Sequence, residues 1–188
     1  MLVKPDFQPT LVGETVIVRP LQPADWPAMF EAASDPLIWQ LHPARNRYTE
    51  PVFREFFESA LESRMAFAFV ARSDDTIIGS SRYHAFEAER REIEIGWTFL
   101  TRAYWGGRTN AEIKRLMINH AFTFVDTVVF WVGEANWRSR RAMEKIGGVQ
   151  RPGVVERAGN SGHPHVVFEI KKASSSAEIC RTADMPPS

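Results

Sequence analysis

The sequence predicts an α/β protein of the α+β type, in which helices pack against a central, mixed and mostly antiparallel sheet. Apolar residues recur with a helical period in some segments and alternate in others, which indicates both helices and strands. The 188 residues suit one domain, and a hydrophobic content of 44% with 24% charged residues is typical of a globular protein. We therefore expect a single domain with its own core.

The charge balance argues against two classes of partner. Lysine plus arginine and aspartate plus glutamate number 23 each, so the formal net charge is zero. General binders of nucleic acid or of a membrane surface are normally basic. The N-terminus MLVKPDFQP has no long apolar run. We therefore expect a cytoplasmic protein that binds neither nucleic acid nor membrane.

The chain divides into a lead-in at residues 1–11, a folded domain at 12–172 and a tail at 173–188. The tail is small, polar and ends in Pro-Pro-Ser, which predicts disorder. The single cysteine, Cys180, lies in this tail, so neither a disulfide within the chain nor a cysteine-based metal site is expected. We expect Cys180 to be an idle thiol.

The first elements are a strand, two helices and a loop between the helices. Thr15–Arg19 is short and β-branched, which indicates a strand. Pro23–Ser34 is predicted to be a helix that begins near a proline, and Leu37–Arg47 to be a loop. Thr49 can cap the second helix. One apolar stripe defines that helix, and its members are Val52, Phe53, Phe56, Phe57, Ala60 and Leu61.

Three strands follow, predicted at Ala66–Ala71, Ile77–Phe86 and Glu92–Leu100. The third alternates cleanly, so its side chains should divide between two faces. The apolar face would carry Ile93, Ile95, Trp97 and Phe99, and the polar face Glu92, Glu94, Gly96 and Thr98.

The second half begins with a glycine turn at Trp105–Gly107 and a long helix. The apolar positions of this helix are Ile113, Leu116, Met117, Ala121 and Phe124. Thr127–Val132 is predicted to be a buried strand and Asn136–Ile146 a short helix that ends at Gly147. Two last strands, near Val149–Arg157 and His165–Lys171, are expected to form a hairpin.

The glycine turn is the first pattern that carries chemistry. A tight turn at a helix N-terminus offers backbone N–H groups to a diphosphate. Gly106 and Gly107 let the backbone approach such a ligand closely, and Arg108 and Asn110 add donors. The alternative is an ordinary connection between a strand and a helix, since paired glycines are common in turns.

The short helix after Thr127–Val132 is strongly basic, with Arg138, Arg140, Arg141 and Lys145. Asn136 is a good N-cap and needs no further purpose. The basic face is either a solvated surface or a contact with a phosphorylated ligand at the glycine turn.

Together these motifs resemble the GNAT acetyltransferase superfamily. The resemblance rests on Glu94–Trp97, Tyr104–Glu112 and Asn136–Ser139 followed by Gly147, and it covers residues 12–171. More narrowly, the chain is similar to the branch of ribosomal-protein N-terminal alanine and serine acetyltransferases. Its segment Val16–Leu21 resembles the first strand of that branch. The resemblance implies a sheet of about seven strands with splayed central strands, about four helices, and acetyl-CoA as co-substrate.

The resemblance also implies the site residues. The turn Trp105–Asn110 would hold the pyrophosphate, the pantetheine arm would bond the free edge of Glu92–Leu100, Asn136 would bond that arm, and Ser139 would lie near the sulfur. The implied cofactor-binding residues are Trp97, Thr98, Trp105, Gly106, Gly107, Arg108, Thr109, Asn110, Asn136, Ser139 and Arg141.

The chain departs from the family pattern at three positions. Arg108 stands where glycine is usual, and Asn110 where glycine or alanine is usual. Met143 stands where many relatives carry a tyrosine that protonates the leaving thiolate. Ser139 is then the remaining candidate for that role.

Acyl transfer from a thioester needs an uncharged amine, and therefore a base. Glu94 is the leading candidate, because it lies on the polar face of the strand that should flank the thioester. Glu92 points the same way and is the fallback, and both have the alternative of being solvated carboxylates. A backbone N–H near Trp97 or Thr98 is the expected oxyanion donor.

The acceptor pocket is expected in the variable parts of the chain. One wall would be the loop from Trp39 to His42 together with Arg45–Tyr48, and Tyr83, with His84, would form another, while His163 and His165 would close the pocket. Each has a plain alternative, since Trp39 and Tyr83 suit a core and loop histidines are ordinary. The histidines have no cysteine or carboxylate beside them in sequence, so no metal site is expected.

The expected activity is therefore transfer of an acetyl group from acetyl-CoA to a primary amine, on a small molecule or a peptide N-terminus. A homodimer is plausible by analogy. A non-catalytic acyl-CoA-binding regulatory module remains an alternative. A dinucleotide-binding domain is excluded, because the sequence has no G-x-G-x-x-G.

Overall fold

The computed structural model describes residues 4–156 and 163–173. The expected end of a strand at Arg157, the tail from residue 174 onward and Cys180 lie outside the described residues. Within the described part, no helix is both long enough and apolar enough to cross a membrane.

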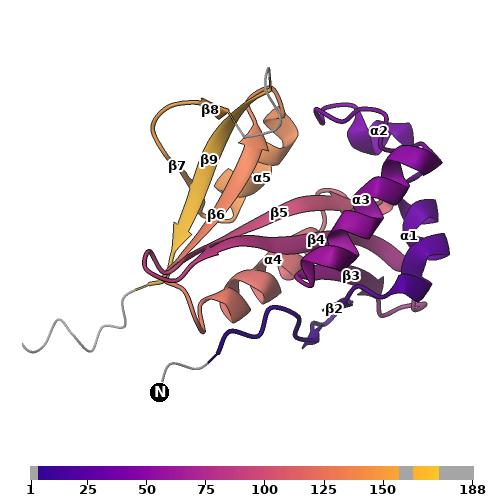
Figure 1. Ribbon diagram of the computed structural model, residues 1–188, viewed down its shortest axis with the longest axis horizontal. Helices are drawn as coiled ribbons and strands as arrows, with labels where there is room; N and C mark the ends of the chain where they lie inside the picture. The colour runs from indigo at the N-terminus through magenta and orange to yellow at the C-terminus, as the bar shows by residue number, and fades with distance from the viewer. Residues whose placement is uncertain (1–3, 157–162, 174–188) are drawn as a thin grey trace, which may run out of the picture.

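A mixed sheet forms the centre of the fold (Figure 1). Its strands run in the order β1-β2-β3-β4-β5-β6-β9-β7, and β8 pairs with β9. Only β5 and β6 are parallel among these described pairs. The strands are β1 Leu11–Val12, β2 Val16–Pro20, β3 Ala66–Ala71, β4 Ile77–Glu87, β5 Glu92–Leu100, β6 Thr127–Gly133, β7 Val149–Gln150, β8 Val155–Glu156 and β9 Pro164–Lys171.

The strand count exceeds the prediction because two features were not expected. The first strand of the predicted hairpin is divided into β7 and β8, with Pro152-Gly153 between them, and Gly153 has a φ of 89°. A proline has no N–H for a ladder, which explains the interruption. The second feature is the short β1, which pairs with β2.

The helices are α1 Trp26–Ala33, α2 Pro36–Trp39, α3 Glu50–Ser63, α4 Arg108–Ala121 and α5 Trp137–Lys145, with 3-10 turns at Pro23–Asp25 and Arg102–Tyr104. The prediction that Leu37–Trp39 lies in a loop was wrong. Asp35 caps α2 by accepting a hydrogen bond from the N–H of Leu37, and Pro36 begins the helix. A proline at that position costs little, because its missing N–H would have no helical partner.

Two apolar layers cover the two faces of the sheet. On β3, Ala66 and Ala68 pack into the layer beneath α1–α3, whereas Phe67 and Phe69 pack into the layer beneath α4. This alternation is the period of a strand with both faces buried. Figure 1 shows the same arrangement, with α1–α3 and α4 on opposite sides of β3–β5.

A bulge at Trp97 changes which side chains of β5 share a face. Arg82 pairs with Gly96 but Ser80 pairs with Phe99, so β5 contains one extra residue here, and Trp97 has a φ of 53°. Ile93 and Ile95 therefore face the α4 layer, whereas Phe99 packs beneath α1–α3. The prediction that Trp97 and Phe99 share a face with Ile93 and Ile95 was wrong.

Strands β5 and β6 separate after a short paired stretch. They pair only at Glu92–Thr127, Ile93–Val128 and Glu94–Val129. Strand β6 instead continues its pairing with β9 as far as Gly133. Figure 1 shows β4–β5 and β6–β9 diverging like the arms of a V. The predicted splay of the central strands is confirmed.

Candidate active site

The glycine turn leads directly into α4 beside the open end of the V. Gly106 has a φ of 67°, which favours glycine, and a side chain at this position would meet no atom within 4 Å. Gly107 is the N-cap of α4 and contributes no side-chain hydrogen bond. The first N–H groups of α4 are therefore not capped by that residue and can serve an anionic ligand.

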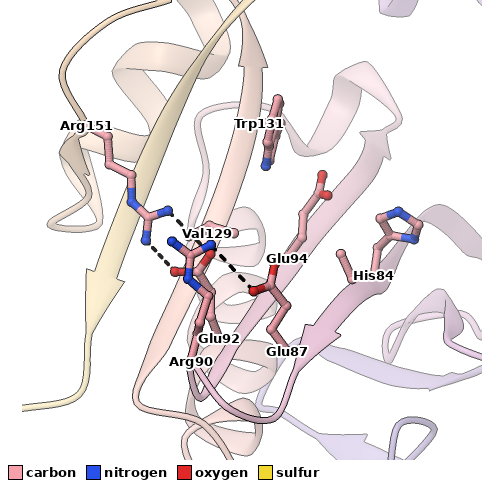
Figure 2. A pocket seen from close by; sticks show the side chains of 9 residues that line it. His84, Glu87, Arg90, Glu92, Glu94, Val129, Trp131 and Arg151 are labelled. Carbon is pink, nitrogen blue, oxygen red and sulfur yellow. Dashed lines mark hydrogen bonds and ion pairs between the residues drawn. The ribbon is translucent and has the colours of Figure 1, made fainter. Parts of the chain in front are cut away.

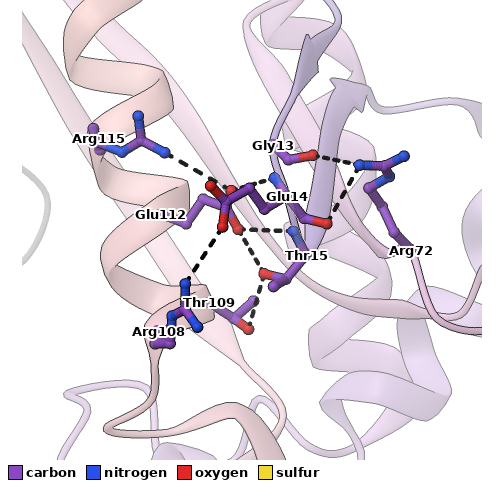
Figure 3. A network of polar contacts seen from close by, with 8 residues as sticks. All are labelled: Gly13, Glu14, Thr15, Arg72, Arg108, Thr109, Glu112 and Arg115. Atoms are coloured by element: carbon purple, nitrogen blue, oxygen red, sulfur yellow. Dashed lines mark hydrogen bonds and ion pairs between the residues drawn. The ribbon is translucent and has the colours of Figure 1, made fainter.

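A polar network holds the start of α4 against the turn between β1 and β2 (Figure 3). The carboxylate of Glu112 accepts hydrogen bonds from the N–H groups of Glu14 and Thr15 and from the Thr15 hydroxyl at 2.5 Å. Burial raises the pKa of Glu112, but these hydrogen bonds outweigh it, so the pKa lies below its ordinary value. The prediction assigned no role to Glu112, whose partners are about a hundred residues distant in sequence.

Two of the three positions that depart from the family pattern, Arg108 and Asn110, lie in the first turn of α4. Arg108 is exposed and reaches Glu14 Oε2 at 3.4 Å. Thr109 Oγ1 lies 3.3 Å from Thr15 Oγ1, and Asn110 is half-buried in the same turn. Arg108 therefore does not block the turn, because its side chain extends away toward the β1–β2 connection.

The start of α5 lies beside the glycine turn. Asn136 caps α5, since its Oδ1 accepts a hydrogen bond from the N–H of Ser139 at 3.1 Å. The guanidinium of Arg138 stacks on the ring of Trp105 at 3.9 Å, which joins α5 to the glycine turn. Arg138 was predicted as part of a basic face and of the motif Asn136–Ser139, but its contact with Trp105 was not predicted. The starts of α4 and α5 thus meet at one edge of the sheet.

Other residues of α5 divide between the surface and the core. Arg141 is exposed and lies 5.4 Å from the ring of Trp137. Ser139 is half-buried, and Met143 is buried in the apolar layer on the α4 side of the sheet. Met143 has no proton to donate, so Ser139 remains the candidate on this helix.

A pocket of about 220 Å³ lies where β5 and β6 begin to separate. Figure 2 shows Glu94, His84 and Trp131 around it, with Glu92 and Arg151 at its side. Glu94 is 2% exposed and is the last residue of β5 that pairs with β6. A carboxylate at this position adjoins both the pocket and the unpaired part of β5.

The fallback base has a different environment. Glu92 is bound by both terminal nitrogens of Arg151, one of them at 3.3 Å, and Arg151 Nε bonds Glu169 at 2.7 Å. The hydrogen bond that Arg151 donates to Glu92 raises the pKa of Arg151, and the one that Arg151 donates to Glu169 lowers the pKa of Glu169. Glu92 therefore belongs to a charge network that links β5 to β7 and β9.

The predicted acceptor residues do not all line an open space. Tyr83 is fully buried, and its hydroxyl donates to Met117 O at 2.6 Å on the α4 side. Burial raises its pKa above the ordinary value. Trp39 is 2% exposed and donates to Ala33 O at 2.8 Å. For both residues the structure favours the alternative of a role in the core.

The loop after α2 reaches toward the end of β6. The ring of Pro43 lies 3.9 Å from the point that a Cβ atom would occupy if Gly133 had a side chain. His42 Nδ1 accepts a hydrogen bond from the N–H of Ala44 at 3.0 Å, and its pKa is lowered to about 3, mainly by burial. Arg47, which the prediction placed only within the loop wall, stacks 5.1 Å from the Trp39 ring. His42 is therefore uncharged at neutral pH.

The remaining predicted residues lie on both sides of the V. His84 is exposed and its ring lies 4.7 Å from that of Trp97. His163 is exposed, whereas His165 is buried on β9 opposite Gly133. In the described part of the chain, no three histidine, cysteine, aspartate or glutamate side chains gather as a metal site would require.

A family model of the acetyltransferase (GNAT) domain matches residues 15–149. The chain belongs to the GNAT acetyltransferase family. The matched region contains the splayed strands, the glycine turn and the start of α5, and this family uses acetyl-CoA. This GNAT protein has no match among curated proteins.

Solved structures support the same fold. A GCN5-related N-acetyltransferase from Brucella melitensis aligns with a TM-score of 0.79 at 18% identity, over 89% of this chain and 80% of that one. A GNAT-family acetyltransferase from Bacillus anthracis gives 0.71 at 21% identity, over 87% and 98%. A proposed ribosomal-protein-serine acetyltransferase from Vibrio cholerae gives 0.71 at 12% identity, over 87% and 97%.

Proposed function

We propose that this acetyltransferase moves an acetyl group from acetyl-CoA to a primary amine, by direct attack of the amine on the thioester. The observation that carries the proposal is the separation of β5 from β6 beside two helix starts. A separated strand offers backbone N–H and C=O groups to an extended ligand, and helix starts favour phosphate.

The donor would bind along this edge. The backbone N–H groups from Trp105 to Asn110, in the glycine turn and the start of α4, would hold the pyrophosphate, and the space above Gly106 and Gly107 leaves room for it. Arg141 would add charge from α5. The side-chain amide of Asn136 would bond the pantetheine arm, since its oxygen already caps α5. The arm would then bond the edge of β5 between Gly96 and Phe99.

Glu94 would be the general base. An amine is largely protonated at neutral pH, so a proton must leave before or during attack. Glu94 lines the pocket on the face of β5 opposite α4, where an acceptor amine has space. Glu92 is the weaker candidate, because the Arg151 guanidinium already donates hydrogen bonds to both of its carboxylate oxygens.

The chemistry balances without a covalent enzyme intermediate. The nitrogen lone pair attacks the carbonyl carbon, and the oxyanion accepts a backbone N–H near the bulge at Trp97 and Thr98. The C–S bond then breaks, the nitrogen loses a proton to Glu94, and the thiolate takes a proton to leave as coenzyme A. Ser139 is the proposed donor of that proton, because Met143 cannot supply one.

The acceptor class is proposed from the pocket and from one relative. The pocket is too small for a folded domain but admits an alkyl amine or the first residue of a peptide. The Vibrio cholerae relative has a proposed action on a ribosomal protein. We therefore propose a peptide N-terminus or a small primary amine as acceptor.

The test compares two glutamate substitutions in the same pocket. Purified protein is incubated with acetyl-CoA and a panel of peptide and small-molecule amines, and thiol release is measured. Glu94→Gln is expected to lower kcat by about 100-fold or more while the acetyl-CoA Kd is unchanged. Glu87→Gln changes a carboxylate that also lines the pocket but is paired with Arg90, and it should leave kcat nearly unchanged.

Two results would contradict the proposal in different ways. Binding of acetyl-CoA with no turnover on any amine would instead support a regulatory acyl-CoA-binding module. Absence of acetyl-CoA binding by calorimetry would overturn the donor site itself.

A further inference from the structure

A buried lysine lies beneath the point where β5 and β6 separate. Lys114 on α4 is 4% exposed, and its Nζ lies 2.9 Å from Thr98 Oγ1 and 5.0 Å from the centre of the Phe130 ring. Thr98 belongs to β5 and Phe130 to β6, and both follow the last paired residues of these strands. The amine therefore lies at the floor of the gap between the strands.

A directional chain of hydrogen bonds runs from this lysine to the bulge. The hydroxyls of Thr98 and Ser81 are 2.8 Å apart, and Ser81 donates to Gly96 O at 3.0 Å. Because each hydroxyl has one proton, Thr98 must then donate to Ser81, and Lys114 to Thr98. The chain ends on the carbonyl of the residue before the bulged Trp97.

The charge of Lys114 is not balanced by a carboxylate. Burial is the one cause that lowers its pKa, to about 7, and no ion pair joins it to any described residue. On α4, Glu112 bonds the β1–β2 turn and Arg115 is exposed. Among the charged groups of β4 and β5, Arg82 bonds Ser59 of α3 on the opposite face, and Glu87, Glu92 and Glu94 line the pocket on that face.

The buried layer on the α4 side of the sheet consists of apolar side chains. Phe130 of β6, Phe168 of β9 and Met143 of α5 belong to the same buried layer. An apolar side chain would fill this space without the cost of removing an amine from water. An ammonium has three N–H donors, and among the described residues Thr98 is the one hydrogen-bond acceptor recorded for Lys114.

We propose that Lys114 is a positioning residue for the acetyl donor. It fixes the bulge of β5 through Thr98 and Ser81, and it donates a further hydrogen bond to a carbonyl oxygen of the pantetheine arm between β5 and β6. This inference rests on the proposed function, because it requires acetyl-CoA to occupy the gap. The arm suits this contact, since an amide or thioester carbonyl is an uncharged acceptor that can lie between strands.

Proton uptake on binding follows from this arrangement. The pKa of Lys114 in the free protein is about 7, so at pH 8 most of the amine is neutral. A carbonyl that accepts a hydrogen bond favours the ammonium and raises the pKa in the complex. Acetyl-CoA binding at pH 8 should therefore take up a proton at Lys114, whereas at pH 5.5 the amine is already charged and takes up little.

The experiment is calorimetry of acetyl-CoA binding at pH 5.5 and pH 8, in two buffers with different ionisation enthalpies. At pH 8 the wild-type protein is expected to take up roughly half a proton or more beyond the uptake of Lys114→Met. Lys114→Met should also bind acetyl-CoA about tenfold more weakly. The matched control Lys145→Met, at an exposed position of α5, should keep the wild-type uptake.

A spectroscopic measurement keeps the test valid if Lys114→Met does not fold. Lysine labelled with ¹³C at Cε, in the wild-type protein, should give one resonance that titrates with a midpoint near 7 and moves to higher pH with acetyl-CoA. Equal proton uptake by wild type and Lys114→Met, or a midpoint that acetyl-CoA does not move, would overturn the role of Lys114 alone. A wild-type protein that does not bind acetyl-CoA would overturn both this inference and the proposed function.

Discussion

At the scale of single residues, two carboxylates two positions apart on β5 have different surroundings. Glu92 is held by Arg151, which also binds Glu169, whereas Glu94 lines the pocket. The alternation of β5 predicted that both would share a face, and Glu94 was ranked above Glu92, but the sequence did not show how the surroundings of the two carboxylates differ. The difference comes from Arg151, which is 59 residues from Glu92 in sequence and has no local signal there.

A substitution at Tyr83 distinguishes a role in core packing from a role in substrate binding. Tyr83→Phe removes a buried hydrogen bond to Met117 O and is expected to lower the free energy of unfolding by about 1–2 kcal/mol. Since the hydroxyl faces the α4 layer, the KM for the amine should not change. Urea unfolding and steady-state kinetics measure the two quantities.

The control for this prediction is Thr123→Val, which removes an exposed hydroxyl outside the proposed site and should alter neither quantity. A rise of tenfold in the amine KM for Tyr83→Phe, with unchanged stability, would return Tyr83 to the acceptor site.

At the scale of elements, the two glycines of the glycine turn are required for different reasons. Gly106 needs a left-handed backbone, because its φ is 67°, whereas Gly107 has a φ of −91° and open space around it. The sequence showed the pair but not which of the two is constrained by its backbone.

We expect Gly106→Ala to lower the free energy of unfolding by about 1–2 kcal/mol, because a side chain is disfavoured at that φ. Gly107→Ala should leave stability nearly unchanged. If a diphosphate approaches this turn closely, Gly107→Ala should still weaken acetyl-CoA binding. Thermal unfolding and calorimetry on both variants make the comparison, and equal stability losses would contradict it.

Element boundaries were predicted best where the hydrophobic pattern and the backbone agree. The limits of β3 and β5 match the prediction, because short alternating or continuous apolar runs end at turns. The bulge at Trp97 could not be predicted, since the sequence alternates without interruption through it. Only the pairing with β4 reveals the extra residue. Similarly, α2 follows from the cap at Asp35, which a proline-based prediction of a loop overlooked.

At the scale of the whole molecule, the two arms of the V are joined along a short seam. Strands β5 and β6 share pairs only between Glu92–Glu94 and Thr127–Val129. The order of motifs identified the family and its splay from the sequence. The placement of Lys114, Arg138 and Glu112 could not be predicted, because each depends on contacts between distant segments.

Hydrogen exchange tests whether acetyl-CoA binds in the gap between β5 and β6. Acetyl-CoA is expected to slow amide exchange by about tenfold or more at residues 96–99 of β5 whose N–H groups face the edge that is not paired with β6, because the arm would occupy that edge. The amides of β2, which pair with β3 on the far side of the sheet, should keep their rates beyond any global stabilisation. Slowing in β2 alone would argue against binding along β5.

The last described strand has a practical consequence for handling the protein. Strand β9 lies between β6 and β7, and the N–H of Lys172 bonds Asp126 O at 2.8 Å, just before the start of β6. The backbone therefore leaves the sheet at the end where β5 and β6 are still paired, whereas the glycine turn follows the other end of β5. A purification handle or a surface anchor joined shortly after Lys172 should therefore leave the proposed diphosphate site unobstructed.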